Sequence, residues 1–170
     1  MQKKIYNNVV GHRVLDDRNV VEDVTSVTLP DVKHPTTNFN TAGMVIAVDI
    51  PDTTRYEPMS FAIAHNNGIN GNLLARPGRH SIEVRVARQD LDIPTSEVEL
   101  ESVKYRITCL HVGTTKGNVE MGNPLGYTDN FSVLGFQEEV NGVITRNHGY
   151  VGPNQVNGVD YGSKLETLLG

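Results

Sequence analysis

The sequence predicts a mainly β protein, an antiparallel β-sandwich or barrel with one or two short helices, built as a single domain over residues 1–170. Its 16 glycines and 8 prolines favour an architecture rich in turns. Several windows alternate apolar and polar residues with a period of two, which is typical of strands that cover a core with one face. Asn-Gly pairs, which suit tight hairpin turns, occur at residues 67–68, 70–71, 141–142 and 157–158. These features indicate antiparallel strands joined by short turns.

Several stretches carry clear strand patterns. The first is residues 44–50, whose large apolar side chains we expect to face a core: Met44, Ile46, Val48 and Ile50. Residues 58–65, PMSFAIAH, alternate large and small side chains, so both faces of that strand could be covered. Residues 82–86 alternate apolar with charged side chains, and residues 136–146, FQEEVNGVITR, predict a hairpin.

A change of phase marks residues 96–112, SEVELESVKYRITCLHV. Apolar residues stand at even positions before Ser102 and at odd positions after it, so we expect a β-bulge near Ser102. The bulge would place the preceding glutamates on the same outer face as Lys104 and Arg106, although that face could simply be solvated. These glutamates belong to the densest acidic cluster of the chain: Asp90, Asp92, Glu97, Glu99 and Glu101.

The acidic cluster permits two interpretations. An acidic wall suits a protein past which nucleic acid must move without sticking. A calcium site is the weaker interpretation, because the cluster lacks the Asp/Asn/Gly rhythm of a calcium-binding loop. The net charge of −5 also argues against a protein whose main work is gripping nucleic acid, since that requires clustered Lys and Arg.

Residues 31–41 form a long, mostly polar joint between two strand-like stretches, and we expect this joint to lack regular structure. Loops of roughly twelve residues or more are uncommon inside compact domains and are usually functional. At the other end of the chain, Ser163 and Glu166 have capping-box spacing and predict a short helix with Leu165, Leu168 and Leu169 on one stripe. So short a helix must dock on its own sheet or on a neighbouring subunit.

Nothing in the sequence points to catalysis, a metal or a cofactor. The six histidines are scattered singly, outside metal-ligand spacings, and nucleophile-elbow and phosphate-loop motifs are absent. Cys109 is the single cysteine and stands in an apolar alternating run, which predicts a buried, inert thiol. Apolar runs stay below the roughly 18 residues that span a bilayer, and the first residues lack the apolar core of a signal peptide, so we expect a cytoplasmic origin without a membrane anchor.

Three stretches carry a resemblance to a known family: SVTLPDV at residues 26–32, NFNTAGM at 38–44 and QVNGVDYGSKLETLLG at 155–170. They resemble the major tail tube proteins of contractile-tailed bacteriophages and the related tubes of R-type bacteriocins. In that family a strand ending in Leu-Pro leads to an aromatic residue and an Ala/Gly-Gly-Met segment, and a Val-Asn-Gly-Val-Asp motif precedes a short tail ending in Gly. Between about residues 52 and 126 the likeness rests on the strand pattern, and the family's mid-chain helix would fall near residues 66–78.

The resemblance implies a structural, non-enzymatic protein that forms the inner tube of a contractile tail from stacked hexameric rings. The implied partners are the surrounding sheath protein, baseplate and tail terminator proteins, and a tape measure protein in the lumen during assembly. In a phage, DNA would pass through transiently. The implied location is the virion tail or a phage-tail-like particle assembled in the cytoplasm of the bacterial host.

The resemblance also implies where subunits meet: a long interface loop at about residues 31–58 and a C-terminal arm at about residues 155–170. Ala42 and Gly43 would permit close backbone approach. The acidic cluster would line the lumen or an interface. The candidate subunit or ring-interface residues are Leu29, Pro30, Lys33, Pro35, Phe39, Ala42, Gly43, Met44, Val156, Asn157, Gly158, Val159, Asp160, Leu165 and Leu168.

The main alternative is a β-sandwich module that binds a small ligand or a carbohydrate. An acidic all-β chain rich in Asn and Gly would also conform to that class. Against it, the chain has no Trp and an aromatic content of 6%, whereas sugar sites commonly stack on aromatic rings.

Overall fold

The computed structural model describes residues 4–66, 73–152, 154–162 and 167–169, with the side chains of residues 4–7 left out. Strands dominate it, as the alternating pattern predicts. In chain order they are β1 Lys4–Asp16, β2 Asn19–Val21, β3 Val24–Thr28, β4 Thr36–Phe39, β5 Val48–Pro51, β6 Ser60–His65, β7 Arg79–Asp92, β8 Glu97–Lys116, β9 Tyr127–Val140, β10 Val143–Gly149, β11 Asn154–Val156 and β12 Val159–Asp160.

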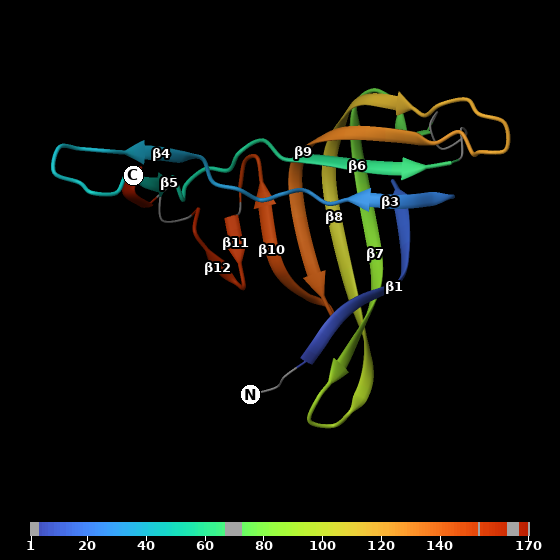
Figure 1. The fold of residues 1–170 in the computed structure, drawn as a ribbon, viewed down its shortest axis with the longest axis horizontal. Coiled ribbons are helices and arrows are strands. Elements are labelled where there is room, and N and C mark those ends of the chain that lie inside the picture. The colour runs from blue at the N-terminus through green and yellow to red at the C-terminus, as the bar shows by residue number, and fades with distance from the viewer. Residues whose placement is uncertain (1–3, 67–72, 153, 163–166, 170) are drawn as a thin grey trace.

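Within the described residues, all strand pairs are antiparallel, which confirms the predicted class. The main path runs β12-β11-β10-β9-β8-β7-β1-β2. The first half of β9 also pairs with β6, and β6 pairs with β3, so the sheet folds back on itself around a core. Three parts project from this barrel-like body: the β4–β5 hairpin, the far end of the β7–β8 hairpin and the loop between β8 and β9 (Figure 1).

The core lies between the β1-β7-β8 layer and the β3-β6-β9 layer. Its largest side chains are Phe61 and Phe131, whose ring centroids lie 5.8 Å apart. Around them pack Val14, Val21, Ile63, Leu74, Ile82, Val84, Ile107, Cys109 and Phe136. Complete burial of one such side chain stabilises the fold by about 1.5–3 kcal/mol, so this cluster holds the two layers together.

The two Asn-Gly pairs that the structure describes form the central residues of hairpin turns. Asn141 and Gly142, at φ 50° and 84°, join β9 to β10 and confirm the predicted hairpin. Asn157 and Gly158, at φ 50° and 80°, join β11 to β12. Both central residues of such a turn need positive φ, which Asn and Gly adopt at low cost. The pairs at residues 67–68 and 70–71 lie outside the described residues.

The prediction that residues 31–41 lack regular structure is wrong, because Thr36–Phe39 form β4 and pair with β5. The prediction that residues 44–50 face a core is also wrong. β5 begins at Val48, and Val45 and Ile46 are 98% and 74% exposed. The alternation of apolar residues is real, but it belongs to a hairpin that projects from the body instead of covering it (Figure 1).

The predicted bulge at Ser102 is absent from the β7–β8 pairing. The register runs without a shift from Asp92 opposite Glu97 to Arg79 opposite Leu110. The glutamates before Ser102 therefore share a face with Val103 and not with Lys104, so that prediction is wrong as well. The physical reason is that this end of the hairpin extends beyond the core, where Val98 and Leu100 can stay exposed.

Helix is scarce in the described chain. Residues 73–74 are helical, within the stretch where a mid-chain helix was expected, and the side chain of Leu74 is fully buried. Residues 167–169 are also helical, and Leu168 and Leu169 are exposed. The predicted capping residues Ser163 and Glu166, and Leu165, lie outside the described residues. No described helix has the length and apolarity needed to cross a membrane.

Candidate assembly interface

The β4–β5 hairpin is the most prominent projection, and we call residues 36–51 the arm (Figure 1). At its base, the amide of Asp52 donates to the carbonyl of Pro35 at 2.8 Å, so the two ends of the arm leave the body side by side. Asn38 donates to Asp49 across the hairpin at 2.8 Å. Apolar side chains on the arm are exposed to between 40% and 98%: Phe39, Met44, Val45, Ile46, Val48 and Ile50.

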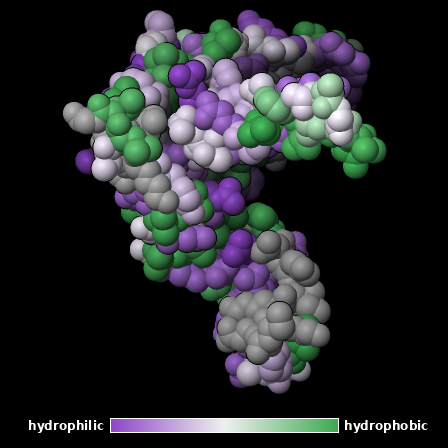
Figure 2. All heavy atoms as spheres, turned by 90° about the vertical axis from the view of Figure 1, so that its left-hand side faces the viewer, coloured by the Kyte–Doolittle hydropathy of each residue, from purple (hydrophilic) through white to green (hydrophobic). Residues whose placement is uncertain are grey.

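Such an arm buries little of its own apolar surface. An isolated hairpin is marginally stable in water, because two strands bury little apolar surface between them. Exposed apolar side chains gathered on one element mark an interaction surface more often than scattered ones do. Figure 2, which views the molecule from the end that carries the arm, shows apolar side chains reaching the surface in several places.

A cluster of rings fixes the base of the arm to the body. His34 stacks on Tyr56 with ring centroids 4.6 Å apart, and Tyr56 lies 4.8 Å from His148 of β10. The hydroxyl of Tyr56 donates to the amide oxygen of Asn154, and His148 Nδ1 donates to the same oxygen at 3.0 Å. Burial lowers the pKa of His148, so the neutral ring is favoured here. Sequence reasoning missed this cluster, since its members are far apart in the chain.

Beside this cluster lies a cavity of about 540 Å³. It is lined on one side by the segment that leaves the arm, including Arg55 and Pro58, and on the other by Leu134 and Tyr150. Tyr150 is 78% exposed. The arm therefore rises next to a partly apolar hollow at the edge of the sheet.

The C-terminal motif closes the same edge of the sheet. Val156 pairs with Arg146 of β10, and the backbone amide of Asn157 donates to the carbonyl of Thr145 at 2.7 Å. Asp160 accepts a hydrogen bond from the amide of Gly162 at 2.9 Å. β12, with Val159 49% exposed, is the last strand on this path among the described residues.

The other predicted interface residues divide between the body and the arm. Leu29 packs against the core and Pro30 is buried, so both anchor the start of the segment within the subunit. Lys33 is exposed and pairs with Asp31 at 3.3 Å. Pro35 stands at the base of the arm, Phe39 lies on it, and Ala42, Gly43 and Met44 form its exposed turn, where Gly43 has φ 100°.

The structure brings all members of the acidic cluster onto one face of the β7–β8 hairpin. Asp92 stands opposite Glu97, Asp90 opposite Glu99 and Arg88 opposite Glu101. Asp90 and Asp92 are buried, whereas Glu97 and Glu99 are exposed near the tip. Arg88 pairs with Glu101 and approaches Asp90 at 3.8 Å. Among the described residues, no group of three or more His, Cys, Asp or Glu has metal-binding geometry.

The opposite face of the same sheet carries a ladder of alternating charges across β7, β8 and β9. Glu83 joins Arg85 and Arg106 at 2.5 Å and 3.4 Å, and Glu139 joins Arg106 and Lys104, both at 3.0 Å. Hydrogen bonding from Lys104 lowers the pKa of Glu139. At Glu83, partial burial acts to raise the pKa, but the hydrogen bonds and charges of Arg85 and Arg106 outweigh burial and lower it. The sequence shows the charged residues of this ladder, but only the strand pairing places Glu83 opposite Arg106 and Lys104 opposite Glu139.

Two buried histidines, His65 and His80, are held by carboxylates. His65 lies 2.8 Å from Asp129, and His80 lies 2.9 Å from Asp16 while its other ring nitrogen donates to the carbonyl of Arg76 at 2.7 Å. All four side chains are almost completely buried. Hydrogen-bonded pairs of this kind satisfy polar groups inside the barrel. They serve the fold and leave the assembly surface to other residues.

The fold and the motifs agree with one family. Residues 11–170 match the family described as phage tail tube protein FII. The chain belongs to this family. No curated protein sequence matches the chain.

A solved structure shares the fold of this tail tube family member. A chain of the PVC sheath-tube complex of an extracellular contractile injection system, in its extended state, superposes with a TM-score of 0.52 at 6% identity, over 75% of this chain and 87% of that one. A chain of the anti-feeding prophage baseplate gives a TM-score of 0.46 at 10% identity, over 75% of this chain and 89% of that one.

Proposed function

We propose that this tail tube protein is the subunit of the inner tube of a contractile phage tail or phage-tail-like particle, in which hexameric rings stack into a hollow conduit. Membership of the phage tail tube family supports a structural role. The observation that carries the assembly proposal is the arm, a projecting hairpin whose apolar side chains, with Val45 98% and Ile46 74% exposed, lie outside the core of their own subunit.

Symmetry explains why such an arm suits a tube. A contact between two different patches on identical subunits closes into a ring if the rotation returns to its start, and otherwise continues as a filament. A stacked tube needs contacts of both kinds. The arm and the edge strand β12 supply two separate surfaces on one subunit, so one element can reach along a ring while the other reaches across rings.

The other proposed partners follow from this role. A sheath protein would surround the tube, with baseplate and tail terminator proteins at its ends and a tape measure protein in the lumen during assembly. The PVC complex that shares this fold contains a sheath and a tube by its own description. We place the finished subunit in the tail of a virion or tail-like particle after assembly in the host cytoplasm, with transient DNA passage in the case of a phage.

The direct test replaces the arm. Because Asp52 donates to Pro35 at the base, residues 36–51 can be exchanged for a short Gly-Ser linker without stretching the body. We expect a folded subunit, checked by circular dichroism, that no longer forms tubes in negative-stain micrographs. A matched control exchanges residues 118–125 for a similar linker, since Gly117 donates to Gly126 at 2.6 Å and closes that loop in the same way. Normal tubes from the arm-replaced protein would refute the role of the arm.

A further inference from the structure

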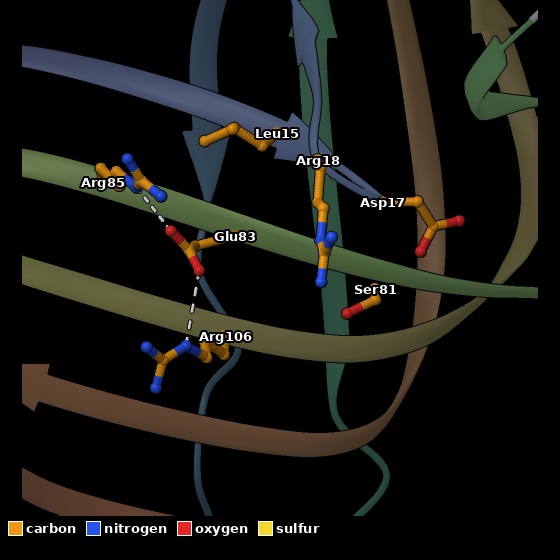
Figure 3. A pocket seen from close by; sticks show the side chains of 7 residues that line it. All are labelled: Leu15, Asp17, Arg18, Ser81, Glu83, Arg85 and Arg106. Atoms are coloured by element: carbon orange, nitrogen blue, oxygen red, sulfur yellow. Dashed lines mark hydrogen bonds and ion pairs between the residues drawn. The ribbon is translucent and has the colours of Figure 1, made fainter.

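An arginine-lined pocket opens on the face of the sheet that carries the charge ladder (Figure 3). It has a volume of about 610 Å³ and is lined by Leu15, Asp17, Arg18, Ser81, Glu83, Arg85 and Arg106. Three guanidinium groups thus face two carboxylates, in a chain whose net charge is −5. The pocket therefore carries a local excess of positive charge.

Both carboxylates of the pocket are already engaged. Glu83 bridges Arg85 and Arg106, and Asp17 pairs with Arg76 at 2.9 Å. The side chain of Arg18, in the turn between β1 and β2, has no hydrogen bond or ion pair to any other described residue, and Figure 3 shows its guanidinium pointing toward Ser81. This arrangement can receive a further carboxylate, because a guanidinium donates to both oxygens of such a group.

The chain offers a matching surface at the other end of the same strands. The acidic face of the β7–β8 hairpin sets Asp92 directly opposite Glu97 and Asp90 opposite Glu99. Oδ1 of Asp92, which is 7% exposed, accepts no hydrogen bond from the described residues. Glu97 is exposed at the tip of this hairpin, so a cationic surface of a second copy can reach it.

The geometry suits a second copy displaced along the strands. In β8, nine residue steps separate Glu97 at the tip from Arg106 at the pocket, which corresponds to roughly 30 Å at about 3.3 Å per residue. The acidic and basic surfaces lie on opposite faces of one continuous sheet. The tip of the β7–β8 hairpin of one copy can consequently lie over the next copy, with its acidic face against the neighbour's basic face.

We propose that the arginine-lined pocket of one subunit receives the glutamates at the β7–β8 tip, Glu97 above all, of a second copy stacked along the strand direction. Such a contact joins unlike surfaces, and a contact of this kind can repeat from subunit to subunit along a tube axis. This inference rests on the proposed tube function and identifies a contact between rings separate from the arm. It assigns the exposed glutamates of the acidic cluster, Glu97 and Glu99, to an interface and not to the lumen.

A charge swap tests the contact. Arg18→Glu and Glu97→Arg are each made in the full chain, then combined, with Lys116→Glu at the exposed end of β8 as the matched control. Each single variant should raise the protein concentration needed for tube formation about tenfold or more, measured by sedimentation and negative stain, because it places like charges together. The combined variant should return to within about threefold of wild type, and the control should remain at the wild-type value.

The outcomes separate this contact from the tube function itself. Circular dichroism and gel filtration of each variant establish that the subunit is folded before assembly is scored. Single variants that assemble like the wild type, or a combined variant no better than its parents, would overturn the contact and leave the tube function standing. A wild-type chain that forms neither rings nor tubes under any condition would overturn the function, and the contact with it.

Discussion

Replacing Val45 and Ile46 by serine at the end of the arm should weaken assembly without harming the fold. These side chains are 98% and 74% exposed in the subunit, so the substitution removes little buried surface within it. Complete burial of a Val or Ile side chain is worth about 1.5–3 kcal/mol. If both are covered in the tube, their loss costs about 3 kcal/mol per contact, which corresponds to roughly a hundredfold in the concentration needed for assembly.

Sedimentation of tubes over a concentration series measures this shift, with negative stain confirming that the pellet contains tubes. The matched control is serine at Val119 and Met121, which are 91% and 104% exposed in the loop between β8 and β9. The control should assemble within about threefold of the wild-type concentration. An arm variant that assembles at the wild-type concentration would refute the reasoning, as would a control that fails equally.

Three further predictions concern the subunit itself. Phe131→Ala should lower the free energy of unfolding by about 3–5 kcal/mol in urea titrations, because it opens a cavity beside Phe61; a loss below about 1 kcal/mol would contradict the packing described. Burial raises the pKa of Cys109 to about 12, so its thiol should resist a disulfide reagent until the chain unfolds, and rapid labelling of the native protein would count against this core. Since burial lowers the pKa of His148 below its unfolded value of about 6.5, the unfolded state binds more protons and stability should fall as pH drops through that value. His148→Gln should reduce this fall and exposed His12→Gln should not; equal pH profiles for wild type and His148→Gln would exclude the effect.

The strands and hairpins could be predicted from local chemistry. Alternation around Ile82 and Val84 gave a strand with one face on the core, and Asn141-Gly142 gave a turn with positive φ. These features depend on neighbouring residues and on the intrinsic preferences of Asn and Gly. The class of the fold follows from them, because short turns force antiparallel pairing.

The resemblance implied an interface loop at about residues 31–58, but its form as a projecting hairpin could not be predicted, and the reason is physical. The apolar alternation from Met44 to Ile50 indicates that one face of the strand is buried, but it does not indicate whether the same chain or another subunit buries it. The same limit applies to Val98 and Leu100, which suggested a bulge because they were assumed to face their own core. In a subunit built to assemble, sequence patterns describe surfaces that the isolated chain leaves open.

Contacts between residues far apart in the chain also could not be predicted from the sequence. The ladder around Glu83 and Arg106 depends on strand register, and the pair His65 and Asp129 joins residues far apart in the chain. Periodicity identifies strands but does not fix which strand lies beside which. The sequence therefore identified charged faces and single histidines without identifying their partners.

The most direct test of the central claim is electron microscopy of the purified wild-type protein over a range of concentrations. We expect rings with sixfold symmetry in projection and hollow tubes of uniform width that lengthen as the concentration rises. A protein that remains a folded monomer at every concentration, and is also monomeric when released from a purified particle, would contradict the account.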